Sequence, residues 1–412
     1  MKIWLVNEGE NLPGDDNNPR LQRMGLLAYV MADHGVDVTW WQSTYNHYQK
    51  KFRYDEDKDI QLGEKFEMKL IHSIGYKKNV CVRRMVHETI TARKFYRKAE
   101  EMLERPDVMV VAMPTIIQTS YAVKFAKKNN IPIVVDVRDL NPDVFTAPFK
   151  GIFKAAVSVG IVPLKYMLSK ALKHADGIVG TTQQYLDWAL NYAKRPQGSN
   201  DEVFFVSYKD TGVKPKATEK KWRDYDFTGK IVCCFFGQFG KLVDFDTIID
   251  CVRKYKDAGN FDYIFLLCGT GEKLEYYQEK AKDLDNVVLP GWVNKDDIAA
   301  IGSISDVGLM AYKPNDNFEK QMPNKFSEYL SLGLVIGLQP TGVMKDLINS
   351  KQCGFSYSDV DSLKSALNAL KEDPYNLEEM KKKSRTVFEN SFSSDVEYLR
   401  YMKYVEKIGG KK

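Results

Sequence analysis

The chain lacks the features that define several classes of protein. Its six cysteines form no CxxC pair, and no apolar run approaches the ~18 residues of a membrane-spanning helix. We therefore expect buried, reduced thiols, no structural zinc site and no transmembrane segment. The first residues, Met1 to Val6, become polar too soon for a signal peptide and are typical of a buried first strand.

Acidic residues are missing from one long stretch of the first half, residues 144–175, where lysines recur among bulky apolar residues. Residues 76–98 are similarly basic, and Glu88 is their single acid. Basic residues that alternate with apolar ones can lie on an anionic membrane surface, or can form a solvated face above a buried core. Two such stretches in one half of the chain favour the membrane surface. Nucleic acid is the weaker partner, because no recognition motif accompanies the charge.

The length and the pattern of elements predict two domains. At 412 residues the chain is too long for one hydrophobic core. Strand and helix patterns alternate, which favours parallel sheets built from βαβ units. After Val206 the pattern loosens into a charged linker at Lys214–Lys221, and a second series follows. We therefore predict an α/β fold with two Rossmann-like domains, residues 1–208 and 209–393, followed by a C-terminal helix in residues 394–412.

The pattern also places the individual elements. The predicted strands are Ile3–Asn7, Val36–Trp41, Met68–Ile71, Val108–Ala112, Ile133–Asp136, Gly177–Thr181, Lys230–Phe236, Tyr263–Cys268, Asn286–Pro290 and Val307–Met310. The predicted helices are Arg20–Asp33, Val82–Met102, Gln118–Lys128, Lys165–Lys173, Phe245–Tyr255, Leu274–Leu284 and Asp395–Ile408.

Glycine-rich turns follow the predicted strands of the second half. Ligands of open parallel sheets bind beyond the carboxyl ends of the strands, and glycines there let the backbone approach a pyrophosphate. Lys241 would add a cation to that contact. The glycines of these turns are Gly237, Gly240, Gly269, Gly271 and Gly291.

A loop with Gly14 follows the first predicted strand. Such a loop alone is weak evidence, because an ordinary long turn has the same composition. Asp15 and Asp16 would repel a phosphate. The backbone of Gly14 and the side chain of Arg20 or Arg23 are therefore the better candidates for contact with a ligand.

The segment Lys320–Gly333 combines two binding features. Pro323 and Asn324 form a predicted tight turn, and a short helix with Glu328 follows. A turn that leads into a helix N-terminus directs free N–H groups and a positive dipole at an anion. Glu328 can accept two hydrogen bonds from a diol, while Met322 and Asn324 offer backbone N–H groups. An anion next to a diol indicates a nucleotide-diphosphate sugar.

Charged residues follow the fifth predicted strand, although the strand itself is apolar. Arg138 and Asp139 lie there, and Thr115 follows the preceding strand, so we expect them at one edge of the sheet. They are candidate acceptor-binding residues, and Asp139 or Asp143 is a candidate for orienting the acceptor or accepting its proton. The alternative is an ion pair of Arg138 with a neighbouring aspartate, which would tie the loop. His47, in an aromatic and basic loop, is a further candidate for positioning a substrate.

The glycine turns and the segment around Glu328 together resemble the donor-site motifs of the GT-B glycosyltransferases of family 4. The matching segments are Gly237–Lys241, Gly269–Lys273, Asn286–Gly291 and Pro323–Glu328. The resemblance implies two facing Rossmann-like domains, with a C-terminal helix that crosses back to the first. It also implies that the N-terminal domain binds the acceptor and the C-terminal domain binds the nucleotide sugar.

One position departs from the family pattern. Family 4 usually has a second glutamate eight residues before the ribose-binding one, and that position is Lys320, with Glu319 one residue away. Lys320 would favour a carboxylate or a diphosphate oxygen, whereas a bulge of one residue would bring Glu319 to the donor sugar. The candidate catalytic residues are therefore Lys241, Glu319, Lys320 and Asp139.

The resemblance implies a retaining, metal-independent transfer that needs no cofactor beyond a nucleotide-sugar co-substrate, with UDP the favoured nucleotide. No DxD motif lies among the residues that end the predicted strands. The implied acceptor is a saccharide on polyprenyl diphosphate, in the synthesis of bacterial O-antigen, capsule or other surface polysaccharide. Such a protein would lie in the cytoplasm, peripherally associated with the inner face of the plasma membrane. Two alternatives stay open: a non-enzymatic GT-B subunit that binds a partner or lipid, and a nucleotide-sugar 2-epimerase.

Overall fold

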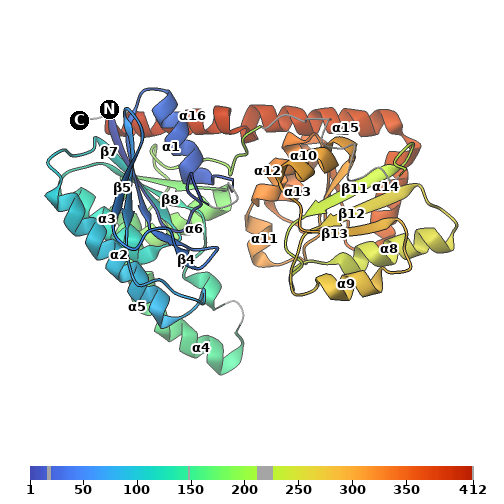
Figure 1. Ribbon diagram of the computed structural model, residues 1–412, viewed down its shortest axis with the longest axis horizontal. Coiled ribbons are helices and arrows are strands. Elements are labelled where there is room, and N and C mark those ends of the chain that lie inside the picture. Colours follow the sequence, from blue (N-terminus) through green and yellow to red (C-terminus); the bar gives the residue numbers. More distant parts are fainter. Residues whose placement is uncertain (16–19, 147–148, 211–225, 411–412) are drawn as a thin grey trace. The chain divides into compact units, whose positions relative to one another are not determined.

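The computed structural model describes residues 1–15, 20–146, 149–210 and 226–410 (Figure 1). The chain divides into two compact units, Met1–Phe205 with Glu397–Lys412, and Val206–Val396. The boundaries predicted from the sequence fall after residues 208 and 393, against 205 and 396 in the structure. The predicted linker at Lys214–Lys221 lies outside the described residues.

The first unit contains an eight-stranded sheet in the order β10-β9-β8-β7-β1-β2-β6-β5. Its strands pair in parallel except β5 with β6. All six residues of β7 are buried, as in strands that are covered on both faces. The strands are β1 (Lys2–Val6), β2 (Asp37–Ser43), β5 (Lys58–Gly63), β6 (Phe66–Ile71), β7 (Val108–Met113), β8 (Ile133–Val137), β9 (Gly177–Gly180) and β10 (Glu202–Val203), beside a hairpin of β3 (Tyr45–Asn46) and β4 (Lys51–Phe52).

Helices cover both faces of this sheet and give it two cores. One core contains buried residues of α2, α3, α5 and α6, while the other contains those of α1 and of the C-terminal helix α16 (Figure 1). The helices are α1 (Arg23–Asp33), α2 (Val82–Glu101), α3 (Ile116–Lys128), the short η1 (Asp143–Phe145), α4 (Gly151–Gly160), α5 (Val162–Lys173) and α6 (Gln183–Ala193).

The C-terminal helix α16 (Ser394–Gly409) belongs to the first unit from Glu397 onward. Its buried side chains recur at the spacing of one helical face. They pack in the same core as the first strand, which confirms the predicted return of this helix to the first unit. These side chains are Tyr398, Tyr401, Val405 and Ile408.

The second unit is a six-stranded parallel sheet in the order β13-β12-β11-β14-β15-β16. Its strands are β11 (Ile231–Phe236), β12 (Tyr263–Cys268), β13 (Val287–Gly291), β14 (Val307–Met310), β15 (Val335–Leu338) and β16 (Gly354–Ser356). Its helices are α8 (Phe245–Asp257), α9 (Leu274–Lys280), α10 (Lys295–Ile304), α11 (Asp316–Lys320), α12 (Asn324–Ser331), α13 (Val343–Lys351), α14 (Val360–Glu372), α15 (Pro374–Val387) and the π-helical turn η3 (Phe388–Phe392).

Both units therefore have the strand order of a doubly wound Rossmann-like sheet, as the sequence predicts. The first helix begins at Arg23 instead of Arg20, because Gln22 has an extended backbone. Several strands lie outside the predicted ones: β15 and β16 in the second unit, and β5, β10 and the β3–β4 hairpin in the first. All six cysteines are free thiols, and every one except Cys81 is buried.

Helix α4 differs from the other α-helices of the first unit because none of its residues is buried. Ile152, Phe153 and Val159 are 80%, 71% and 72% exposed. No single described helix is long and apolar enough to cross a membrane, whereas α4 and α5, bent by 50°, meet that criterion together.

Candidate functional site

The strand orders show where each unit should bind a ligand. In doubly wound sheets, ligands bind at the carboxyl ends of the two strands between which the order reverses. This point lies between β1 and β7 in the first unit and between β11 and β14 in the second. The predicted site residues follow these strands or their neighbours.

The predicted glycine turns of the second unit pack on one another. The amide of Gly269 donates a hydrogen bond to the carbonyl oxygen of Gly291 at 2.7 Å. A Cβ atom on Gly269 would lie only 1.7 Å from the carbonyl oxygen of Gly237, and the φ angle of Gly269 is +149°. Gly271, with φ +152°, also packs closely, since a Cβ atom there would lie 2.7 Å from the backbone nitrogen and oxygen of Phe239. Only glycine allows these turns to approach so closely.

Lys325, in the first turn of α12, joins this cluster although the sequence analysis did not single it out. Its Nζ atom lies 3.8 Å from the ring centroid of Phe235 and donates a hydrogen bond to the hydroxyl oxygen of Tyr312 at 2.5 Å. A Cβ atom on Gly237 would lie 2.5 Å from the same Nζ atom. Burial lowers the pKa of Lys325 to about 7, against the opposing effect of Glu328. A partly buried amine therefore faces the first glycine turn.

Helix α12 forms as the sequence predicts. It begins after Pro323, whose backbone is extended (φ −65°, ψ 156°), and Gly333 follows its end with φ +67°. Glu328 lies one turn into the helix, close enough to influence the pKa of Lys325. Met322, before the helix, is buried, and Asn324 at its first position is exposed.

The three residues predicted to act on the leaving group and donor sugar lie in different surroundings. Lys241 is exposed beside Gly240, where a Cβ atom would meet nothing within 4 Å. Glu319 and Lys320 end the short helix α11. The hydroxyl of Thr341 donates a hydrogen bond to the Glu319 carboxylate at 2.6 Å, while Lys320 is exposed. The roles of these residues toward a donor stay predictions.

The first unit has a cavity of about 390 Å³ at its own reversal point. Three of the four predicted acceptor-binding residues, His47, Thr115 and Asp139, line it together. Thr115 comes from the end of β7 and Asp139 from the end of β8, as predicted from the strand pattern. The remaining lining residues are Glu8, Gly9, Tyr48, Tyr76, Arg84, Glu88, Pro114, Asn141, Val144 and Phe145.

The charges of this cavity depend on pH near neutrality. Burial and the neighbouring Glu8 raise the pKa of Glu88 to about 7, although Arg84 opposes them with an ion pair at 2.8 Å. Burial, together with Lys50 and Arg84, lowers the pKa of His47 to about 4, so the ring is neutral at pH 7. The cavity therefore offers carboxyl groups and a neutral imidazole, which suit the hydroxyl groups of a sugar.

His47 and Tyr76 form a hydrogen-bonded pair within the cavity. The Nδ1 atom of His47 lies 2.6 Å from the hydroxyl oxygen of Tyr76. Burial raises the pKa of Tyr76 well above its usual value, so the hydroxyl keeps its proton. If this hydroxyl donates to Nδ1, the Nε2–H of a neutral His47 is a hydrogen-bond donor for a ligand.

The two candidate aspartates are held differently. Asp139 lies in the cavity, its carboxylate accepts a hydrogen bond from the backbone amide of Leu140, and burial raises its pKa. The carboxylate of Asp143 accepts hydrogen bonds from Trp188 and Tyr192, each at 2.9 Å, and pairs with Lys165 at 2.8 Å. Asp143 is therefore occupied by the fold, and Asp139 is the better placed of the two.

Arg138, the fourth predicted acceptor residue, does not line the cavity. It forms ion pairs with Glu10 and with Asp136, the latter at 3.2 Å. Asp136 also pairs with the buried Arg23 at 2.9 Å, and Arg23 donates to the carbonyl oxygen of Phe204. The structure thus has the ion pair that the sequence left open as the alternative for Arg138, and Arg23 is held inside the fold.

Gly14 also lies outside this cavity, in a separate pocket of about 230 Å³. Its φ angle is +85° and a Cβ atom there would meet nothing within 4 Å. The neighbouring Asp15 pairs with Arg53 at 2.5 Å. Asp15 is therefore neutralised by a partner, which weakens the argument that it would repel a phosphate.

Sequence reasoning missed three residues that the fold brings to these sites: Lys325, Glu8 and Glu88. Glu88 was visible as the single acid of a basic stretch, and Lys325 lay inside the predicted donor segment. Neither position had a spacing signal of its own.

No group of three or more His, Cys, Asp or Glu side chains suited to a metal ion occurs among the described residues.

The two Rossmann-like units and the returning C-terminal helix define a GT-B fold, shared with solved glycosyltransferase structures. A model of the family described as Glycosyl transferases group 1 matches residues 217–387. The second unit thus contains a group 1 glycosyltransferase domain. No curated protein matches the chain significantly in sequence.

Three solved structures illustrate the fold similarity. HepE from Anabaena in complex with UDP superposes with a TM-score of 0.67, at 12% identity over 99% of this chain and 100% of HepE. Sucrose-phosphate synthase from Thermosynechococcus elongatus superposes with a TM-score of 0.70, at 13% identity over 100% of both chains. WaaG, a glycosyltransferase involved in lipopolysaccharide biosynthesis, superposes with a TM-score of 0.63, at 12% identity over 98% of this chain and 99% of WaaG.

Proposed function

We propose that the protein is a retaining, metal-independent glycosyltransferase of family 4 that uses a nucleotide-diphosphate sugar, with UDP the favoured nucleotide. The observation that carries this proposal is the packing of the Gly237, Gly269 and Gly271 turns beside Lys325, in a group 1 glycosyltransferase domain. One neighbour in fold, HepE, has been solved in complex with UDP and with UDP-glucose, which supports a UDP-sugar donor.

In this proposal the donor diphosphate lies on the glycine turns of the second unit. Lys325 and Lys241 supply cations to the diphosphate, and the amides at the start of α12 donate hydrogen bonds to it. Glu328 accepts hydrogen bonds from the ribose hydroxyls. Electrostatic stabilisation of the departing diphosphate then lowers the barrier to transfer. The diphosphate itself takes the proton of the acceptor hydroxyl, which needs no separate protein base.

The acceptor in this proposal is a saccharide carried on polyprenyl diphosphate, in the synthesis of O-antigen, capsule or another bacterial surface polysaccharide. Its reacting sugar occupies the first-unit cavity, where Asp139 and Glu88 orient hydroxyl groups and His47 donates through Nε2. The neighbour WaaG, which is involved in lipopolysaccharide biosynthesis, supports this class of acceptor.

The membrane carries that acceptor, and we propose that α4 lies on the cytoplasmic face of the plasma membrane. The reading of residues 144–175 as a basic face over a buried core does not fit α4, since its apolar side chains are exposed. Val80 and Val82 at the start of α2 are also exposed apolar side chains, both more than 70% accessible. An apolar surface with lysines and no acids suits an anionic bilayer.

The test is turnover of a panel of UDP-, GDP- and ADP-sugars with a short prenyl-diphosphate saccharide as acceptor. The proposal expects transfer from one UDP-sugar, retention of the anomeric configuration in the product and full activity in a chelator. Release of an isomerised nucleotide sugar would instead establish the 2-epimerase, for which the three carboxyl groups and His47 of the cavity are the supporting observation. If transfer, hydrolysis and isomerisation are all absent, the non-enzymatic subunit is favoured.

A further inference from the structure

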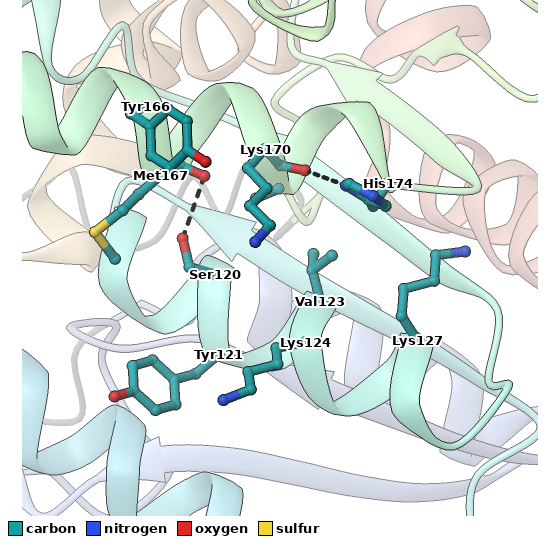
Figure 2. Close-up of a pocket in the computed structure, with 10 residues that line it drawn as sticks. Ser120, Tyr121, Val123, Lys124, Lys127, Tyr166, Met167, Lys170 and His174 are labelled. Carbon is teal, nitrogen blue, oxygen red and sulfur yellow. Dashed lines mark hydrogen bonds between the residues drawn. The ribbon is translucent and has the colours of Figure 1, made fainter.

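A third hollow of the first unit lies away from the cavity and the pocket described above. It is a groove of about 500 Å³ between α3 and α5 (Figure 2). The residues that line it recur at helical spacing on both helices, so one continuous face of each helix forms a wall. On α3 these residues include Ser120, Val123 and Lys127, and on α5 they include Met167 and Lys170, with His174 directly after the helix.

The groove changes character along its length. At one end the hydroxyl of Ser120 donates to the backbone oxygen of Met167 at 3.4 Å, and the ring of Tyr166 lies nearby (Figure 2). At the other end stand Lys127 and His174. The eight residues from Ser120 to Lys127 span roughly 10 Å of helix. The groove is therefore apolar and aromatic at one end and basic at the other.

The basic end has a cation that the fold leaves exposed. Lys127 pairs with Asp176 at 2.7 Å, and the Nζ atom of Lys124 lies 5.4 Å from the ring centroid of Tyr96. Lys170 is exposed, and Figure 2 shows its side chain reaching from α5 into the space that Val123 enters from α3. No acidic residue lines the groove among the described residues. The net positive charge matches an anion rather than a zwitterion.

The direction of the groove relates it to the exposed helix α4. Tyr166, at the apolar end, is 68% exposed and lies near the start of α5, which directly follows α4. A ligand with an apolar chain toward α4 and a phosphate toward Lys170 would match both ends of the groove.

We propose that this groove binds one anionic phospholipid of the bilayer, with an acyl chain along Tyr166 and Met167 and the phosphate at Lys170. The site would select anionic lipid at the docked surface. It rests on the proposed membrane association of α4 but is separate from the donor and acceptor sites. The apolar lining holds the chain, and the lysine supplies a charge-assisted hydrogen bond to the phosphate.

The test uses the full chain and a lipid that stays monomeric, so that it does not depend on docking to vesicles. Dihexanoyl phosphatidylglycerol, below its critical micelle concentration, is titrated calorimetrically and observed bound by native mass spectrometry. We expect saturable binding of one molecule, and affinities about tenfold weaker for dihexanoyl phosphatidylcholine and for Lys170→Glu. Lys173→Glu is the matched control, because Lys173 is exposed on the same helix but does not line the groove.

Three comparisons of affinity for monomeric ligands would each overturn the proposal. These are equal affinity for the two lipids, equal weakening by Lys170→Glu and Lys173→Glu, and equally tight binding of glycerol 3-phosphate, which has no chain. Binding to vesicles of phosphatidylglycerol and phosphatidylcholine is measured in parallel. If the wild type binds these vesicles but no monomeric lipid, the groove proposal fails while the proposed docking of α4 stands.

Discussion

The Nζ atom of Lys325 lies 3.8 Å from the ring centroid of Phe235, at the edge of the sheet where the glycine turns meet. Burial there lowers the lysine pKa to about 7, from about 10.4 in an unfolded chain. Between these values the unfolded chain binds a proton that the folded chain does not, so folding stability rises with pH.

Replacement of Lys325 by methionine should remove this pH dependence. We expect Lys325→Met to stabilise the ligand-free protein most at pH 6, with the advantage falling by up to about 1.4 kcal/mol per pH unit between pH 7 and 10. Urea unfolding of both proteins across this range measures the difference, and all other titrations cancel. Parallel stability curves would show that Lys325 titrates normally.

The packing of the glycine turns predicts a contrast between two alanine substitutions. Gly269→Ala places a Cβ atom 1.7 Å from the Gly237 carbonyl oxygen at φ +149°, so it should lower stability by about 1–3 kcal/mol or more and weaken nucleotide binding at least about tenfold. Gly240→Ala is the control, because nothing lies within 4 Å of its Cβ position and its φ is not positive. The melting temperature is measured for both variants, and equal destabilisation would refute the packing argument.

Glu88 should make acceptor use pH-dependent near neutrality. Its pKa of about 7 means that its carboxylate, the stronger hydrogen-bond acceptor, forms as pH rises from 6 to 8. We expect kcat/KM for the acceptor to rise over this range, and Glu88→Gln to be about 10- to 100-fold lower at pH 8 without that rise. The KM for the donor should stay unchanged. A rise of the same size and midpoint in Glu88→Gln would assign the titration to another group.

The exposed face of α4 predicts the strength of membrane association. The double substitution Ile152→Ser and Phe153→Ser removes two side chains that are 80% and 71% exposed, so it should spare the melting temperature and reduce binding to anionic vesicles at least about tenfold. Vesicle flotation measures the bound fraction. Unchanged flotation in the double variant would exclude α4 as the docking element.

The general architecture could be predicted because the central strands, such as β7 and β8 of the first sheet and β11 and β12 of the second, are buried and largely apolar. β11 (Ile231–Phe236) and β12 (Tyr263–Cys268) are buried at every position, so hydrophobicity alone marks them. β16 (Gly354–Ser356) is too short to give a period, and it forms only because β15 offers it a partner. Short strands of this kind depend on tertiary pairing that the sequence does not display.

The candidate sites likewise contain residues whose positions the sequence predicts and residues whose positions it does not predict. The glycines after β11, β12 and β13 could be placed because parallel strands end at one edge. The burial of Lys325 and Arg138 could not be predicted, because it depends on side chains far away in sequence. These are the ring of Phe235 for Lys325 and the carboxylate of Glu10 for Arg138. Arg138 shows the limit most clearly: adjacency to aspartates fits a ligand-binding role and a structural ion pair equally well.

The central claim is that the second unit binds a nucleotide diphosphate through its glycine turns and Glu328. The most direct measurement is a thermal shift of the wild type and Glu328→Ala with UDP, GDP and ADP at millimolar concentration. A nucleotide at about 100 times its Kd should stabilise the wild type by roughly 2.7 kcal/mol. The account predicts a rise in Tm with UDP that Glu328→Ala loses, through affinity about 10- to 100-fold weaker. No rise with any nucleotide, or an equal rise in both proteins, would contradict it.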